Sequence, residues 1–367
     1  MTRITLLLLF VASNCWTMFS PVAAEDFCVE TAVELQAALW QAQINAQNNH
    51  IKIVKGVYQT ADNGSLGLGF QYDNSMPASL TITGGWTTGC GLFRGRSSAF
   101  ETVLDGGNLD RVLSINAGND NVAIALRNLT IQSGFPYESD AVVGGLLIKG
   151  FGEQDQAGNV LIDRVVFTGN TAYSVSALAV ESFGRVDISN SLFYNNTVAL
   201  FYTAGVSRNS NSSDGTYFVN NTVVDNTALS DETYANAAIV LQISDSGGAV
   251  AANNVMWNNT SLDLAFMGSS TNSHLLYNTV QNVIGNIGTN VGNITVDPML
   301  AGNYTLMQNS PVLDAGFEPP TGPLNPPLEL DWELGDTDIV GFPRHTGAAV
   351  DMGAFEAYDW LFNDRFE

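Results

Sequence analysis

A seven-residue repeat runs through the middle of this chain and limits the folds that it can adopt. Its clearest copy is Asn190-Ser-Leu-Phe-Tyr-Asn-Asn196, and further copies begin at Asn128, Arg164, Asn220 and Asn253. Successive copies therefore start 36, 26, 30 and 33 residues apart. The fourth place is always apolar, being occupied by Ile131, Phe167, Phe193, Val223 and Met256. A period of this length, built from strand-forming residues, predicts a solenoid whose turns stack on one another.

A second apolar run lies between successive copies of the repeat, for example in residues 144–148 and 237–241. As far as residue 291, short β-rich runs alternate with clusters of Gly, Asn, Ser and Asp. This alternation is typical of strands joined by tight turns. We therefore predict an all-β fold, a right-handed parallel β-helix. Its fourth-place residues would form one internal stack, with a rise of about 4.8 Å per coil.

The seventh place of the repeat is predicted to lie at the corner of each coil. It is occupied by Gly134, Asn170, Asn196, Asn226 and Asn259. Gly and Asn tolerate the left-handed backbone conformation that a sharp corner requires, so we expect that conformation at these positions. Two further roles stay open for these Asn side chains. They could hydrogen-bond from one coil to the next, or they could line a ligand groove.

The ends of a solenoid need covers, because open strand edges pair with other chains. Residues 31–46 are predicted to form a helix at the N-terminal end, with Thr31 and Glu34 as its capping box. Four of its apolar residues lie on one helical face, namely Val33, Ala37, Trp40 and Ile44. The C-terminal cap is expected from the residues after Val291, where the repeat fails.

The first residues resemble a secretion signal. Arg3 precedes an apolar run over residues 6–11, and residues 22–24 offer a small-residue cleavage site. We predict a signal peptide over residues 1–24 and an exported protein that is secreted or associated with the cell surface or outer membrane. No later run has the length of a transmembrane helix. In an oxidising compartment Cys28 and Cys90 are expected to form a disulfide, with two buried free thiols as the alternative.

The charge of the chain bears on its partners. The formal net charge is −23, from 36 acidic and 13 basic residues. Nucleic acid and anionic membranes bind basic surfaces, so the sequence argues against both as partners. It also disfavours direct binding of polyuronates unless divalent cations bridge the two anions.

The last section carries the most specific motifs. In order they are Val296-Asp-Pro-Met-Leu300, Tyr304-Thr-Leu306, Ser310-Pro-Val-Leu-Asp-Ala-Gly316, Gly341-Phe-Pro-Arg344 and Val350-Asp-Met-Gly-Ala-Phe-Glu356. Together they resemble the choice-of-anchor Q domain of bacterial exported proteins, which closes a pectate-lyase-like right-handed β-helix. The resemblance implies a solenoid over residues 25–291 and a choice-of-anchor Q-like region over residues 292–356. It implies location and shape rather than a defined reaction.

Residues 357–367 form a short acidic and aromatic tail. Many proteins of the resembling family end in a sorting or anchoring segment, but this tail has neither an apolar span nor a basic stop. Export signal, cap and frayed end all stay open as roles for it.

Three aspartates are the candidate catalytic residues. Asp163 and Asp187 fall in adjacent predicted coils, and Asp225 immediately precedes the corner residue Asn226. A glycoside hydrolase would need two such carboxylates beside a bound sugar. The alternative is that each is a solvated or turn-capping side chain.

A denser acidic cluster suggests a metal. It contains Glu329, Asp331, Glu333, Asp336 and Asp338. Carboxylates at this spacing can hold Ca²⁺, although the order of residues is not that of an EF-hand, and a solvated acidic loop is the alternative. The sequence indicates no other cofactor. Arg344, Asp351 and Glu356 are expected to form a structural ion-pair set.

Three functions are compatible with these features. The first is an exported β-helix that binds or displays at the cell surface without catalysis, with an extracellular polysaccharide as its partner. Tyr194 and Trp257, at the outward fifth place of the repeat, are its candidates for stacking on sugar rings. The second is a polysaccharide lyase or hydrolase acting in the β-helix groove, which the scarcity of basic and histidine residues disfavours. The third is a structural or adhesive solenoid without a small ligand.

Overall fold

The computed structural model describes most of the chain after residue 24. The described residues are 25–65, 69–74, 76–91, 97–118, 122–136, 143–150, 158–182, 184–208, 215–230, 236–243, 247–260, 262–268, 271–319 and 334–357. The predicted signal peptide, the acidic candidates Glu329, Asp331 and Glu333, and tail residues 358–367 lie outside them. Within the described residues, no helix is long and apolar enough to cross a membrane.

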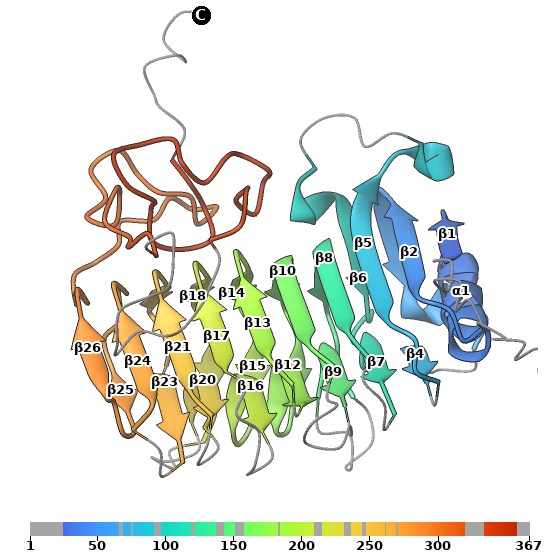
Figure 1. Ribbon diagram of the computed structural model, residues 1–367, viewed down its shortest axis with the longest axis horizontal. Coiled ribbons are helices and arrows are strands. Elements are labelled where there is room, and N and C mark those ends of the chain that lie inside the picture. The colour runs from blue at the N-terminus through green and yellow to red at the C-terminus, as the bar shows by residue number, and fades with distance from the viewer. Residues whose placement is uncertain are drawn as a thin grey trace, which may run out of the picture.

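The chain winds into a solenoid of parallel strands, as predicted (Figure 1). The longest row of paired strands is β1 (Glu25–Val29), β2 (Asn49–Val54), β5 (Leu80–Trp86), β8 (Ile124–Gln132), β10 (Val160–Thr168), β13 (Val186–Ser189), β17 (Thr216–Val219), β21 (Ala249–Ala252), β24 (Ser273–Leu276) and β26 (Thr289–Val291). Branching from it are β3 (Gly56–Gln59), β6 (Thr102–Asp105), β14 (Leu192–Tyr194), β18 (Thr222–Val224) and β22 (Val255–Trp257).

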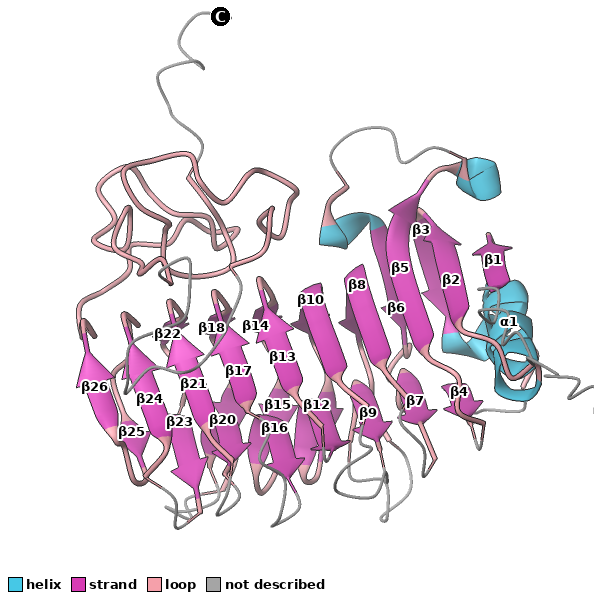
Figure 2. Ribbon diagram, in the orientation of Figure 1, coloured by secondary structure: helices cyan, strands magenta, loops and turns pink. Residues whose placement is uncertain are grey.

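Two further sheets form other sides of the solenoid, and the smaller one spans three coils. The larger contains β4 (Phe70–Asp73), β7 (Leu113–Asn116), β9 (Leu146–Lys149), β12 (Val175–Ser182), β16 (Tyr202–Arg208), β20 (Ala237–Gln242), β23 (Leu262–Met267) and β25 (Val283–Ile284). The smaller contains β11 (Thr171–Ala172), β15 (Thr197–Val198) and β19 (Thr227–Ala228). The helix α1 (Ala32–Ile44) and three short 3₁₀ turns, η1 (Thr60–Asp62), η2 (Thr88–Cys90) and η3 (Ala99–Glu101), lie in the N-terminal part (Figure 2).

The core is the predicted internal stack. Phe167 pairs in register with Ile131 on one side and Phe193 on the other, and Phe193 pairs with Val223. All of these side chains are fully buried, and the Phe167 and Phe193 rings stack with centroids 4.7 Å apart. Fourth-place residues repeat in space because the parallel register places equivalent residues of successive coils beside one another.

The corners differ from the prediction in which residue is left-handed. Positive φ occurs at the first place of the repeat, for example 50° at Asn190, and at the sixth place, for example 53° at Asn195. None of the predicted residues Gly134, Asn170, Asn196, Asn226 and Asn259 has a positive φ. The seventh place follows the left-handed residue, and its side chain turns into the coil, where Asn170 and Asn196 are fully buried. The sixth-place residue makes the bend. The side chain of the seventh-place residue is therefore available for another role.

That role is hydrogen bonding between coils, the first of the two that the sequence left open. In each step the side-chain Oδ1 of one Asn accepts from the backbone N–H and the Nδ2 of its counterpart in the preceding coil. Asn196 donates both bonds to Asn226, at 3.1 and 3.0 Å, and Asn170 does the same to Asn196. The Nδ2 atom also reaches a core carbonyl, as in Asn226 to Phe193 (3.0 Å). The ladder satisfies buried backbone groups at every corner.

A second ladder, not predicted, runs along the second place of the repeat. It consists of Ser191, Asn221, Asn254, Asn278 and Asn293. Asn221 donates its backbone N–H to Asn254 Oδ1 at 2.9 Å, and its Nδ2 reaches the carbonyl of Ile188, also at 2.9 Å. Two parallel ladders therefore flank the stack of fourth-place residues.

Asn226→Ala is expected to lower the free energy of unfolding by roughly 2 to 3 kcal/mol, because it leaves buried donors on Asn196 without acceptors. Urea unfolding followed by circular dichroism measures the change. Asn309→Ala, at an exposed position, is the matched control and should shift stability by less than about 0.5 kcal/mol. Equal shifts for the two variants would contradict a stabilising role for the ladder.

The N-terminal end is covered by α1, as predicted. Thr31 and Glu34 form the capping box. The face expected to be apolar is, however, the exposed one: Val33, Trp40 and Ile44 are 55%, 50% and 68% exposed. The buried face contains Leu35, Leu39 and also Gln36, which is only 1% exposed. Gln36 accepts from the backbone N–H of Gln71 and donates to its carbonyl, both at 3.0 Å. The Gln36 side chain therefore satisfies backbone groups at the edge of strand β4. A pattern of hydrophobic residues does not predict such a contact.

The predicted disulfide is present. Cys28 on β1 is bonded to Cys90 on η2, with Cα atoms 5.7 Å apart. It holds the chain after β5 against the first strand of the solenoid.

The C-terminal region, residues 298–319 and 334–357, was expected to close the end of the solenoid. It lies instead along the side of the later coils (Figure 1). Val312 and Met352 pack on Val255 of β22, and Leu334 and Val350 pack on Val250 of β21. The outward faces of β21 and β24 are buried beneath it, and β17 lies at its edge. The region is therefore a side cover for the later coils, while the earlier coils keep an exposed face.

Candidate functional site

A polar groove of about 510 Å³ lies where this side cover stops. Its floor is the outward face of β8, β10, β13 and β17, and its far wall is formed by Gly335, Asp336 and Thr337 of the C-terminal region. The groove contains two of the three predicted catalytic residues, Asp163 and Asp187. Its other side chains include Arg127, Asn159, Arg164, Arg185, Ser189 and Tyr217.

The parallel register explains why these side chains meet. Arg127, Asp163 and Ser189 are direct partners on neighbouring strands. Asp187 pairs in the same way with Leu161 and with Tyr217. Successive residues of a strand point to opposite faces, so these two rows, two residues apart, both project outward.

Arg185 is fixed in the groove by two neighbours. Its Nε and Nη2 atoms lie 2.8 Å from the two carboxylate oxygens of Asp187. The guanidinium carbon lies 4.1 Å from the centroid of the Tyr217 ring, in a cation–π contact. Both side chains of the ion pair remain partly accessible, with exposed fractions of 29% and 24%. A bidentate pair resting on an aromatic ring presents its hydrogen-bonding edges in a set orientation.

Asp163 is also held by its surroundings. One carboxylate oxygen accepts from Asn190 Nδ2 (2.9 Å) and Ser189 Oγ (3.3 Å), and the other accepts from Arg164 Nε (3.3 Å). Its neighbour Arg127 is exposed and forms no ion pair with any residue that the structure describes. The groove therefore combines prearranged groups with one uncommitted guanidinium.

Asp225, the third catalytic candidate, lies elsewhere. It occupies a corner with a φ of 55° and accepts hydrogen bonds from Tyr304 (3.0 Å) and Asn258 (2.6 Å). Burial, together with Asp225, raises the pKa of Tyr304 to about 12. The side chain of Asp225 thus helps to hold the C-terminal region on the coil, and the three aspartates do not form one site.

The two candidates for stacking on sugars are covered rather than free. Tyr194 packs against Tyr304 with ring centroids 4.9 Å apart. Trp257 is partly buried in the same apolar cluster and borders a smaller cavity of about 280 Å³ with Pro298 and Gly302. Both do point outward from the coil, as expected, but the outward face at those positions is where the C-terminal region packs. The sequence analysis predicted open stacking platforms at Tyr194 and Trp257. The structure corrects this, because both rings are partly buried against the C-terminal region.

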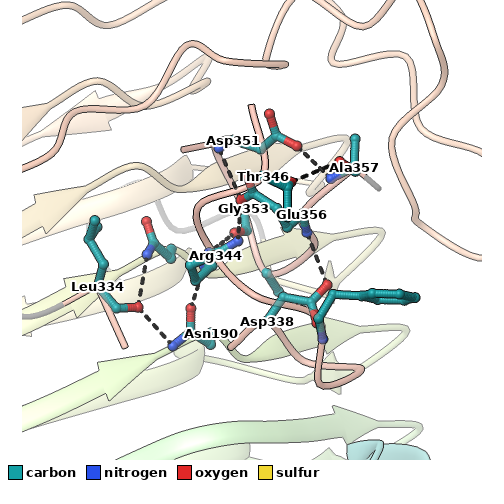
Figure 3. Close-up of polar contacts among 12 residues, drawn as sticks. Asn190, Leu334, Asp338, Arg344, Thr346, Asp351, Gly353, Glu356 and Ala357 are labelled. Carbon is teal, nitrogen blue, oxygen red and sulfur yellow. Dashed lines mark hydrogen bonds and ion pairs between the residues drawn. The ribbon is translucent and has the colours of Figure 1, made fainter. Parts of the chain in front are cut away.

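The expected ion-pair set around Arg344 is present and joins the C-terminal region to the solenoid (Figure 3). Arg344 is fully buried, with Nη1 3.4 Å from Glu356 Oε2 and Nε donating to Asn190 Oδ1 at 2.9 Å. Asp338 and Asp351 complete the cluster, so one cation faces three carboxyls. Burial raises the pKa of Glu356 to about 8, against the influence of Arg344, and raises the pKa values of Asp338 and Asp351.

First-place Asn residues of the repeat are the main docking points for the C-terminal region. Asn190 and Asn220 donate to the Leu334 carbonyl, at 3.2 and 3.4 Å. Asn253 exchanges two hydrogen bonds with the backbone of Phe317, at 2.9 and 2.7 Å. Asn190 also contacts Asp163, so a single side chain links the buried Arg344 cluster to the groove.

Of the predicted Ca²⁺ ligands, two are described. Asp338 is buried and accepts from the backbone N–H groups of Val340, Phe342 and Glu356, so it organises the loop around it. Asp336 is in the wall of the groove. Among the described residues, no three or more His, Cys, Asp or Glu side chains are grouped so that they could hold a metal ion.

Sequence reasoning missed Arg127 and Tyr217 as groove residues. They could have been identified by their constant distance from the first residue of each repeat copy. Arg127, Asp163 and Ser189 each directly precede a first-place residue, and Asp187 and Tyr217 each lie three residues before one. Aligning the copies would have placed these side chains in two outward rows.

Comparison with known proteins adds no relative. No protein-family model matches the chain, and no curated protein matches it. The parallel β-solenoid is therefore established by its own strand pairing, and the likeness to choice-of-anchor Q proteins rests on the motifs quoted above.

Proposed function

We propose that the protein is an exported, non-catalytic binding module that holds a neutral glycan in the groove between β8 and β17. The observation that carries the proposal is the Arg185–Asp187 pair, which is seated on the Tyr217 ring and partly open to solvent. Sugar hydroxyls both donate and accept hydrogen bonds, and charged planar groups held in advance bind them at low entropic cost.

The charge of the groove supports a neutral ligand. Arg127, Arg164 and Arg185 are balanced there by Asp163, Asp187 and Asp336. A polyanionic glycan would meet three carboxylates in the groove and a net charge of −23 on the whole chain. A neutral polysaccharide meets donors and acceptors in equal measure.

The hydrogen bonds of the two aspartates favour binding over hydrolysis. A glycosidase needs one carboxyl that delivers a proton and another that attacks or activates water. Both oxygens of Asp187 are engaged by Arg185, and both oxygens of Asp163 accept hydrogen bonds from neighbouring side chains. Each is suited to orienting another group.

The setting of this module is part of the proposal. The secretion-like residues 1–24 and the ordered motifs between Val296 and Glu356 support a secreted or cell-surface protein with a choice-of-anchor Q-like C-terminal region. The acidic charge supports a partner other than nucleic acid.

A glycan array, followed by calorimetry on the best ligand, tests the proposal. Arg185→Met should weaken binding by about tenfold or more, because a charge-assisted hydrogen bond is lost and Asp187 is left unpaired. Lys149→Met is the matched control, since Lys149 lies on β9 in the other large sheet and should leave affinity unchanged.

An assay for reducing sugars and unsaturated products runs alongside the calorimetry. Turnover of any polymer would replace the binding module with an enzyme. Binding that Arg185→Met and Lys149→Met weaken equally would move the site away from the groove.

A further inference from the structure

The two ends of the solenoid are finished differently. At the N-terminal end α1 lies against β4, and Gln36 satisfies the exposed backbone of that edge strand. At the other end β25 and β26 are the last strands of their sheets, each paired on one side only by another described strand. The C-terminal region runs along the side of the coils and leaves this end uncovered within the described residues (Figure 1).

Apolar surface is exposed along the same coil. Val291 and Val296 are 48% and 49% exposed, and Ile287 is only partly buried where it closes the internal stack. The second Asn ladder also ends here, at Asn293, which accepts from Asn278. An edge strand with unpaired backbone groups and apolar neighbours is a template for a further strand.

This part of the chain carries no charge. Residues 264–296 contain no Asp, Glu, Lys or Arg, in a protein whose formal net charge is −23. Charged side chains are the usual protection of an exposed edge, and they would also repel a second copy of so acidic a chain. The last coil has no such charged side chains. Its edge therefore lacks the usual protection, and no charge on it repels a second copy.

We propose that this end binds a second copy of the same chain, tail to tail, through the edges of β25 and β26. A two-fold axis places the same surface on both partners and lets the edge strands pair in antiparallel fashion. Two copies of this uncharged surface meet without charge repulsion. A partner recognised through its charge would need charged groups on this coil, and residues 264–296 have no Asp, Glu, Lys or Arg. The N-terminal edge strand, β1, is also paired on one side only, but it carries the carboxylates of Glu25 and Asp26. These charges disfavour pairing with another copy of so acidic a chain, so the contact closes as a dimer and does not extend into a fibre.

Sedimentation equilibrium over a range of concentrations tests the proposal, with Ile287→Glu as the variant. The native chain should reach the mass of a dimer. Ile287→Glu should raise the dissociation constant by about tenfold or more, because the two-fold axis brings the two new carboxylates together. Ile44→Glu on the exposed face of α1 is the matched control and should leave the dimer intact.

The geometry has a separate readout. In a chain with Cys15→Ser, oxidation should cross-link Asn290→Cys, at the centre of β26, and should not cross-link Ala37→Cys on α1. Circular dichroism establishes that each variant is folded. A monomer at every concentration would overturn the proposal. So would a dimer that Ile44→Glu disrupts while Ile287→Glu does not, since it would assign the interface to α1.

Discussion

Replacing Arg344 with methionine is expected to lower the free energy of unfolding by about 3 to 5 kcal/mol. The guanidinium is fully buried between the C-terminal region and the solenoid, and it donates to Asn190 while facing Glu356. Methionine fills much of the same volume but leaves Asp338, Asp351 and Glu356 without a cation. Removing the buried cation costs far more than the cluster contributes in net stability. Asp338 and Asp351 lose their counter-ion while they stay desolvated, and Asn190 Oδ1 and the Gly353 carbonyl lose their donor.

Urea unfolding and limited proteolysis measure this effect. Arg127→Met is the matched control, since Arg127 is exposed, and it should change stability by less than about 0.5 kcal/mol. Arg344→Lys should fall between the two, because lysine keeps the charge but loses the planar fork that reaches Asn190 and Glu356 together. A loss below about 1 kcal/mol for Arg344→Met would mean that apolar packing alone holds the C-terminal region in place.

Those parts of the fold that depend on local spacing could be predicted from the sequence. Parallel coils stack equivalent residues, so the apolar fourth place of the repeat gave both the solenoid and its core, including Phe167 and Phe193. The capping box of Thr31 and Glu34 depends on residues three apart, and it is found as predicted. In each case one short-range rule determines the outcome.

The corner conformation could not be assigned correctly from composition alone. Asn occupies both the sixth and the seventh place in two copies of the repeat, and either could make a left-handed bend. The seventh-place side chains bond to the coils on both sides, as Asn226 does to Phe193 and Asn259, and this requires them to point inward. The sixth-place residue, such as Asn195, is therefore the one that bends.

The candidate site was only half predictable, because its boundary is a tertiary feature. Asp163 and Asp187 were identified, and the repeat offset would have added Arg127 and Tyr217. Nothing local indicates that the C-terminal region lies along the side of the solenoid. That packing covers Tyr194 and forms the wall of the groove at Asp336. It depends on contacts between residues more than a hundred positions apart, such as Arg344 with Asn190.

Stability of the Arg344 cluster should depend on pH in the direction opposite to ordinary acid denaturation. Burial raises the pKa of Glu356 from 4.5 to about 8, so between these values the folded protein holds a proton that the unfolded chain releases. The free energy of unfolding contributed by this group therefore falls as pH rises through that window, by up to about 5 kcal/mol. Below pH 4.5 both states are protonated, and above pH 8 both are ionised.

Glu356→Gln isolates this effect, because glutamine keeps the shape of the protonated carboxyl and does not titrate. Its amide oxygen can accept from Arg344 and the Asp351 N–H, and its NH₂ group can donate to Thr346 Oγ1. We expect the variant to match the native protein near pH 5 and to be more stable near pH 9. Urea unfolding midpoints across this range measure the difference, with Arg127→Met as a control whose offset stays constant. If Glu356→Gln and the native chain lose stability in parallel as pH rises, the proton is not on Glu356, and Asp338 or Asp351 would be the carboxyl that keeps it next to Arg344.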